Sequence, residues 1–288
     1  MKNNHSLVVK TIAKMIKFRQ SFKGTVGFVP TMGYLHEGHM SLIKMARKEN
    51  DHVVVSIFVN PTQFGLNEDY SRYPRDTKRD LELLTKNNVD VVFLPTVEEL
   101  YPKNYETYVI VDDITTRLEG KSRPTHFRGV TTIVTKLFNI IQPNRAYFGQ
   151  KDAQQAVVIK KMVADLNMPI EIIVGEIVRE SDGLAMSSRN VYLYKIERNE
   201  AVVLSQSLQL AKAMFTKGER NCENIKTEMK KLINKTSGLI DYVSIANTKT
   251  LLELKVIKNE ALVSMAVRFG KTRLIDNIVL KESSNKKR

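Results

Sequence analysis

The stretch "TVGFVPTMGYLHEGHMSLI", residues 25–43, joins an apolar run to a turn that contains two glycines and two histidines. The apolar run is short and continuous, which is typical of a strand covered on both faces. The segment that follows the turn, residues 39–50, places Leu42, Ile43 and Ala46 on one stripe of a helix. The stretch therefore predicts strand, turn and helix, the repeating unit of a parallel α/β sheet.

The same pattern recurs along the first 178 residues. Further strand-like runs occupy residues 52–60, 89–95, 145–149 and 170–178. Helical periodicity recurs between and beside them, at residues 77–88, 130–142 and 153–167. Alternating strands and helices imply right-handed crossovers and predict a Rossmann-like, doubly wound parallel sheet.

Beyond about residue 178 the pattern changes. Two helical stretches, 195–217 and 221–236, precede shorter runs of alternating hydrophobicity at residues 241–248, 261–269 and 272–280. Alternation is typical of antiparallel strands with one covered face. We therefore expect a Rossmann-like domain over residues 1–177 and a smaller C-terminal α+β domain over residues 178–288.

The composition is that of a globular chain, with 42% hydrophobic and 26% charged residues in 288. A single cysteine, Cys222, excludes an intramolecular disulfide framework and a multi-cysteine zinc site. We find no run long enough for a signal peptide or a membrane span, and we expect a cytoplasmic protein. The net charge of +14 suits anionic partners, but the basic residues are mostly scattered, which favours a solvated lysine-rich surface. Charge alone therefore decides nothing about nucleic acid.

Ligands of open parallel sheets bind beyond the carboxyl ends of the strands, where the turn at residues 31–38 is expected to lie. Gly33 and Gly38 allow the backbone to approach a ligand, and the new helix offers unpaired N–H groups to an anion. His36 and His39 could both hydrogen-bond one phosphate group. Two alternatives stay open: histidines that only cap the turn, and a metal pair, for which no completing ligand is evident.

Three other segments offer donors at the same expected edge. In "FGQKDAQQ", Lys151 is a candidate phosphate or ribose contact and Asp152 a candidate helix N-cap. In "AMSSRN", two serines and Arg189 form a concentrated donor set for phosphate oxygens. In "FVNPTQFG", the Gln63 amide can both donate and accept. An exposed lysine with a capping aspartate and ordinary loop residues are the alternatives.

Six blocks follow one another in order over roughly residues 25–194: "PTMGYLHEGH", "VVVSIFVNPTQFG", "YPRD", "RPTHFRGVTTIVTKLFNIIQP", "YFGQKDAQQ" and "VRESDGLAMSSRNVYL". Together they resemble the pantothenate synthetase (pantoate–β-alanine ligase) family of the HIGH-motif nucleotidyltransferase superfamily, whereas the C-terminal third matches loosely.

The resemblance implies an ATP-dependent ligase that condenses (R)-pantoate with β-alanine through a pantoyl-adenylate intermediate and releases AMP and pyrophosphate. It further implies Mg²⁺ as a cofactor, small-molecule substrates rather than nucleic acid or membrane as partners, a homodimer, and a smaller domain that closes over the active site. The "MSSR" segment would be the counterpart of the KMSKS loop of related adenylating enzymes.

The family pattern also implies roles for individual residues. His36, His39 and Lys151 would be catalytic, with His39 as the proton donor. Gln63 and Gln155 would bind pantoate beside β-alanine, and Asp80 would contact magnesium. The implied ATP-binding residues are Met32, Gly33, His36, Gly38, His39, Gly149, Gln150, Lys151, Asp152, Val178, Met186, Ser187, Ser188 and Arg189.

Two rival functions remain to be weighed. A related nucleotidyltransferase acting on a phosphorylated acceptor would share the histidine turn but would not need "FVNPTQFG" or "FGQKDAQQ" in this form. An RNA-binding protein would use the +14 charge, but the sequence lacks an RNA-recognition signature, an aromatic stacking cluster and any tryptophan.

Overall fold

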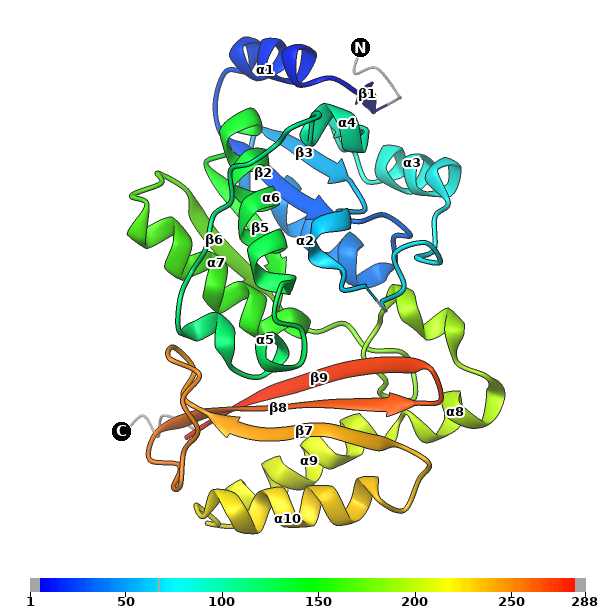
Figure 1. Ribbon diagram of the computed structural model, residues 1–288, viewed down its shortest axis with the longest axis vertical. Helices are drawn as coiled ribbons and strands as arrows, with labels where there is room; N and C mark the ends of the chain where they lie inside the picture. Colours follow the sequence, from blue (N-terminus) through cyan, green and yellow to red (C-terminus); the bar gives the residue numbers. More distant parts are fainter. Residues whose placement is uncertain (1–5, 67, 283–288) are drawn as a thin grey trace.

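A computed structural model describes residues 6–66 and 68–282. Within these residues six parallel strands form one sheet, in the order β1-β4-β3-β2-β5-β6 (Figure 1). The strands are β1 (Leu7–Val9), β2 (Val26–Thr31), β3 (His52–Ile57), β4 (Val91–Phe93), β5 (Arg145–Gly149) and β6 (Glu171–Gly175). The predicted Rossmann-like class is confirmed, and β1, which periodicity did not predict, adds an edge strand beside β4.

Helices cover both faces of this sheet, as its continuous apolar strands require. On β3, Val54 packs into the cluster formed with α1, α6 and α7, whereas Val53 and Val55 pack on the side of α2 and α3. All three valines are fully buried. The helices of this part are α1 (Ile12–Ser21), α2 (Glu37–Glu49), α3 (Thr77–Lys86), α4 (Val97–Leu100), α5 (Glu119–Ser122), α6 (His126–Ile141) and α7 (Ala153–Asp165).

The strand order reverses between β2 and β5. These two strands are hydrogen-bonded neighbours, with Gly27 opposite Arg145 and Phe28 opposite Ala146, although many residues separate them along the chain. The turns that leave β2 and β5 therefore open side by side at the carboxyl edge. This is the place where open α/β sheets bind their ligands.

The described C-terminal part forms a separate antiparallel sheet of three strands, β7 (Leu239–Ala246), β8 (Glu260–Phe269) and β9 (Thr272–Lys281). Its own apolar core lies under α9 (Val203–Thr216) and α10 (Cys222–Ile233). These two helices pack on the face turned away from the parallel sheet, and β9 lies nearest to that sheet (Figure 1). The α+β character expected for this part is confirmed.

The helical stretch predicted over 195–217 is two helices. The first, α8 (Lys195–Glu200), ends before a turn at residues 201–202, and α9 then begins. Neither glycine nor proline occurs in this stretch, so periodicity alone could not locate the break. Within residues 6–66 and 68–282, no helix combines the length and the apolar character that crossing a membrane needs.

Candidate active site

A large cavity of about 1560 Å³ lies between the carboxyl edge of the parallel sheet and the C-terminal sheet. Most of the residues predicted from sequence line it: Met32, His36, Gly38, His39, Gln63, Gly149, Lys151, Asp152, Gln155, Val178, Met186, Ser187, Ser188 and Arg189. Gly33, Gln150 and Asp80 do not line it. Segments from three distant parts of the chain therefore face one another across the same space.

The two histidines are held by the start of α2. His36 is the N-cap residue, and its Nδ1 accepts a hydrogen bond from the Gly38 N–H at 3.1 Å. His39 Nδ1 accepts in turn from the His36 N–H at 3.2 Å. A neutral imidazole that accepts at Nδ1 carries its proton on Nε2. Each ring therefore has an Nε2–H donor to offer the cavity, and the capping alternative turns out to be part of the same arrangement.

Burial determines the charge of these rings. It is the main cause that lowers the pKa of His36 to about 4, with nearby Lys151 adding to the effect. Burial, and next the neighbouring His36, hold the pKa of His39 well below its ordinary value. Both imidazoles are consequently neutral at neutral pH. They can supply directed hydrogen bonds to an anion, while Lys151 supplies positive charge.

The Asp80 side chain holds the turn between β2 and α2 in place. Its two carboxylate oxygens accept the backbone N–H groups of Tyr34, at 2.7 Å, and Leu35, at 2.8 Å. The backbone turns sharply here, because Gly33 and Tyr34 have positive φ angles of 82° and 51°. Asp80 is only 1% exposed, and burial raises the pKa of its carboxyl group. This carboxylate, for which the family resemblance implies a magnesium contact, holds the turn that carries the histidines.

Gln63 lies in a short 3₁₀ helix, η1 (Pro61–Gln63). Its amide oxygen accepts from the Asn60 side chain at 3.1 Å, and its backbone oxygen accepts from the His126 Nδ1–H at 2.9 Å. A Cβ atom on Gly129 of α6 would come within 2.4 Å of the Thr62 carbonyl oxygen, so glycine is what lets α6 pack on η1. His126 therefore supports the Gln63 backbone.

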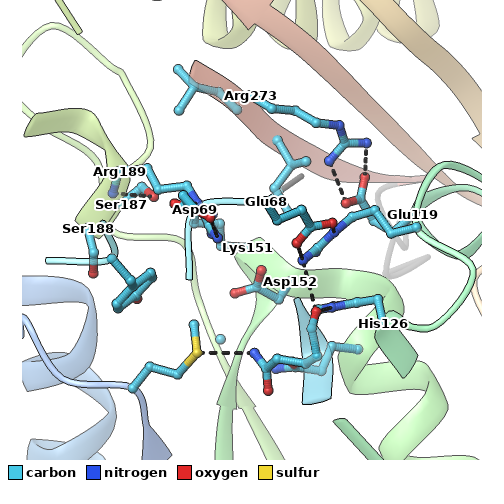
Figure 2. A pocket seen from close by; sticks show the side chains of 18 of the residues that line it. Glu68, Asp69, Glu119, His126, Lys151, Asp152, Ser187, Ser188, Arg189 and Arg273 are labelled. Atoms are coloured by element: carbon cyan, nitrogen blue, oxygen red, sulfur yellow. Dashed lines mark hydrogen bonds and ion pairs between the residues drawn. The ribbon is translucent and has the colours of Figure 1, made fainter. Parts of the chain in front are cut away.

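The turn after β5 forms a 3₁₀ helix, η3 (Gln150–Asp152), that leads into α7. Asp152 occupies the N-cap position of α7, but its side chain makes no capping hydrogen bond, which corrects the predicted capping role. Its carboxylate faces the cavity beside Lys151, and both are seen at the centre of Figure 2. Gln155 also lines the cavity, whereas its neighbour Gln154 is buried and bonds to Glu119 and two backbone carbonyls.

The segment after β6 folds back on itself before it reaches the cavity. The Met186 N–H donates to the Val178 carbonyl at 3.0 Å, so these two lining residues are paired. The next turn is a 3₁₀ helix, η4 (Ser188–Tyr192), and the Ser188 hydroxyl donates to the Tyr34 carbonyl at 3.2 Å. This bond joins the "MSSR" segment directly to the histidine turn.

Three charged residues that sequence reasoning did not single out, Glu68, Asp69 and Arg123, also line the cavity. Arg189 makes two 2.9 Å hydrogen bonds to Asp69, and Arg123 is paired with Glu68. Arg123 begins the block "RPTHFRG", and Glu68 and Asp69 follow "FVNPTQFG" within four residues. Pairing between distant loops leaves no trace in the spacing of either block.

A further ion pair joins the C-terminal sheet to helix α5. Arg273 of β9 makes two hydrogen bonds to Glu119 of α5, at 2.6 and 2.9 Å, and two more to Asp241 (Figure 2 shows the Arg273–Glu119 pair). The Tyr242 hydroxyl also donates to Glu119. The C-terminal sheet is thereby tied to the parallel-sheet domain at the rim of the cavity.

The strand order of the parallel sheet reverses between β2 and β5, and a cavity lined by hydrogen-bond donors lies at the carboxyl edge there. These two features define a nucleotide-binding α/β enzyme. The family model described as pantoate-beta-alanine ligase matches residues 7–279. The chain belongs to the pantoate–β-alanine ligase family.

Individual relatives agree along nearly the full length. A pantothenate synthetase of Acetivibrio thermocellus is 57% identical over 277 residues, covering 95% of this chain and 99% of its own. Crystal structures of the pantothenate synthetase of Thermus thermophilus match with a TM-score of 0.90 at 45% identity, covering 94% of this chain and 98% of theirs. The Francisella tularensis ligase, crystallised with β,γ ATP and β-alanine, matches at 0.80 and 37% identity, covering 97% and 99%.

Replacing Asp80 with asparagine should lower the free energy of unfolding by about 1–3 kcal/mol, because one of the two backbone N–H groups loses its acceptor. Urea denaturation measures this loss. Asp76→Asn is the matched control, since Asp76 caps the same helix and asparagine is an equally good cap. An Asp80→Asn protein that keeps its stability but loses its dependence on Mg²⁺ would assign Asp80 to the metal instead.

His126 should make stability fall as the solution is acidified. Burial lowers the pKa of His126 to about 4, whereas a histidine in the unfolded chain titrates near 6.5. Between these values the unfolded state binds the extra proton, so stability is fully present above about pH 6.5 and decreases as pH falls towards 4. In His126→Gln, whose amide can still donate to Gln63, the slope of unfolding free energy should be shallower by up to about 1.4 kcal/mol per pH unit.

Urea denaturation of both proteins from about pH 7.5 down to about pH 4.5 measures the two slopes across this window. The proteins should be similarly stable at the upper end. Parallel slopes would contradict the assignment of a depressed pKa to His126.

Proposed function

We propose that this chain joins (R)-pantoate to β-alanine in two steps, through a pantoyl-adenylate intermediate, with the cavity residues in the roles given below. As a pantoate–β-alanine ligase the chain needs an activated carboxyl group, because an oxide ion is too poor a leaving group for an amine to displace. ATP supplies the activation. The observation that carries the assignment of roles is the meeting of residues 32–39, 149–152 and 186–189 around one cavity.

In the first step a carboxylate oxygen of pantoate attacks the α-phosphorus of ATP. The bond from that phosphorus to the bridging oxygen breaks, and pyrophosphate leaves with the electron pair. Negative charge builds on the phosphate oxygens, where His36 and His39 offer Nε2–H donors and Lys151 a cation. Preorganised donors of this kind stabilise the transition state without reorganising during the reaction.

In the second step the amine of β-alanine attacks the acyl carbon. The bond to AMP breaks, the ammonium proton is lost, and pantothenate is released. Gln63 and Gln155, whose amides line the cavity, would orient pantoate through its hydroxyl and carboxyl oxygens. No residue need form a covalent bond, so alignment of the two substrates is the main contribution of the protein.

The remaining segments would hold the nucleotide. Val178 and Met186, paired through their backbones, would contact the adenine and ribose side. Ser187, Ser188 and Arg189 would bind the triphosphate. The backbone geometry of the two turns would also help to hold the nucleotide, through Gly33, Gly38, Gly149 and Gln150. Of these four residues, Gly33 and Gln150 do not line the cavity.

Mg²⁺ would accompany the ATP phosphates and neutralise part of their charge. Asp80 does not suit this role, because both of its oxygens are occupied by backbone N–H groups outside the cavity wall. Asp152 suits it better, since its carboxylate faces the cavity and is not used for helix capping.

Three larger-scale features belong to the same proposal. We place the domain boundary between residues 177 and 178, just after β6 ends at Gly175. The C-terminal domain would close over the bound nucleotide. Two chains would associate as a homodimer, as the family resemblance implies, in the cytoplasm, with pantoate, β-alanine and ATP as the small-molecule partners.

The proposal is tested by pantoate-dependent exchange of pyrophosphate into ATP, which reports the first step alone. His39→Ala should slow this exchange by about 10²–10³, the scale for losing one preorganised donor. His39→Asn should lose as much, although its amide oxygen can still accept the His36 N–H and keep the cap. His52→Ala is the control, since His52 lies at the opposite end of the sheet.

Normal exchange in His39→Asn, or exchange without pantoate, would contradict these roles. AMP release should require β-alanine in the wild-type protein, and release without it would favour the nucleotidyltransferase rival.

Asp69 should compete with the triphosphate for Arg189, because both need the same guanidinium donors. Asp69→Asn is expected to tighten ATP binding about two- to fivefold, the range for a partly exposed ion pair. Isothermal titration calorimetry measures the dissociation constant. In an Arg189→Gln background the same change should have no effect, and weaker binding in the single variant would contradict the competition.

A further inference from the structure

Strand β9 of the C-terminal sheet sends two adjacent side chains to two different segments of the cavity wall. Asp276 and Asn277 are 1% and 3% exposed. Successive residues of a strand point to opposite faces, so neighbouring side chains can reach separate parts of the molecule. Both residues lie in "TRLIDNIVL", which carried no functional signal beyond a strand pattern.

Asn277 holds the turn after β5. Its Nδ2 donates to the carbonyl oxygens of Gln150, at 3.0 Å, and Lys151, at 2.9 Å. Its Oδ1 accepts from the Gln150 side chain at 3.0 Å. Both ends of the amide are therefore used on the short η3 helix. These hydrogen bonds from β9 fix the backbone at Lys151, and the lysine side chain faces the cavity (Figure 2).

Asp276 holds the segment after β6. Its carboxylate pairs with both terminal nitrogens of Arg179, at 2.7 and 3.0 Å, and its side chain is fully buried. Arg179 also donates to the Gly183 carbonyl and is bridged to Ala185. These contacts close the fold-back that brings Val178 and Met186 together. A buried carboxylate left without its partner is strongly destabilising, so this pair keeps the fold-back in one position.

We propose that Asp276 and Asn277 are positioning residues for the nucleotide: together they set the distance between the Lys151 turn and the Val178–Met186 pair. The inference rests on the proposed function, in which these two segments bind the same ATP molecule. Since the two side chains are neighbours on one strand, and the Asn277 N–H also donates to Asp276 at 2.8 Å, moving either disturbs the spacing.

A merely structural role predicts something different. Asp276 and Asn277 would then contribute to stability, and a variant that still folds would bind ATP normally. A positioning role predicts that ATP binding and adenylation suffer in the folded variant, because a displacement of about 1 Å at a reacting centre can cost 10²-fold in rate. The affinity for ATP in folded protein is therefore the deciding measurement.

Three variants test the two positions in the full-length protein. Asn277→Leu removes both donors at nearly constant volume, and Asn277→Ser is a milder change that keeps one hydroxyl. Asp276→Asn removes the charge that pairs with Arg179. Ser264→Ala is the matched control, since Ser264 is buried on β8 opposite Asn277 and its hydroxyl has no hydrogen-bond partner among the described residues.

ATP affinity by calorimetry, pantoate-dependent pyrophosphate exchange and thermal unfolding are measured for each protein. Asn277→Leu and Asp276→Asn should weaken ATP binding about tenfold and slow exchange by about 10–10², with a smaller effect for Asn277→Ser. The KM for pantoate should change less than the KM for ATP. Ser264→Ala should bind and exchange as the wild type does.

A double variant checks that Asp276 acts through Arg179. Arg179→Gln should reproduce the loss seen in Asp276→Asn, and combining the two should add little, because both break one contact. Variants that fold and bind ATP with wild-type affinity would overturn the inference while leaving the ligase function intact. A wild-type protein without pantoate-dependent exchange would instead overturn the proposed roles themselves.

Discussion

The pairing of β2 with β5 is the constraint on which the site depends. Each strand is followed by a turn and a helix, and parallel pairing sends both turns to the same edge of the sheet. The helix after β2 covers one face of the sheet and the helix after β5 covers the other face. A crevice is left between the two turns. The histidines after β2 and Lys151 after β5 consequently face one cavity, although they come from distant parts of the sequence.

Much of the site is supported by residues that do not touch the cavity. Asp80 holds the histidine turn through two backbone N–H groups, and Gly129 allows α6 to pack against the helix that carries Gln63. Support of this kind explains why the histidines can be both capping residues and donors. Their Nδ1 atoms are used by the backbone, which leaves the Nε2–H groups for a ligand.

The C-terminal sheet holds residues of the cavity wall in place through its side chains. Arg273 reaches Glu119 at the cavity rim, and Asp276 and Asn277 reach the two segments on either side of the proposed nucleotide. Any movement of this sheet would therefore displace the two segments that these side chains hold. The short side chain of Asn277 is long enough to reach the turn after β5, because β9 is the strand of its sheet that lies nearest to the parallel sheet (Figure 1).

The sequence by itself determined the parallel strands β2 to β6, the antiparallel character of the C-terminal part and the segments that form the cavity. Those features depend on local periodicity, turn residues and motifs, which are written in neighbouring positions. The partners of Asp80, Asp69 and Asp276 were decided only by the tertiary structure, because each carboxylate meets groups from a distant segment. Asp80 lies four residues after Asp76, and this spacing looks the same in sequence whether the Asp80 carboxylate binds metal, solvent or buried backbone N–H groups. Only packing, which removes water and leaves particular N–H groups within reach, distinguishes these cases.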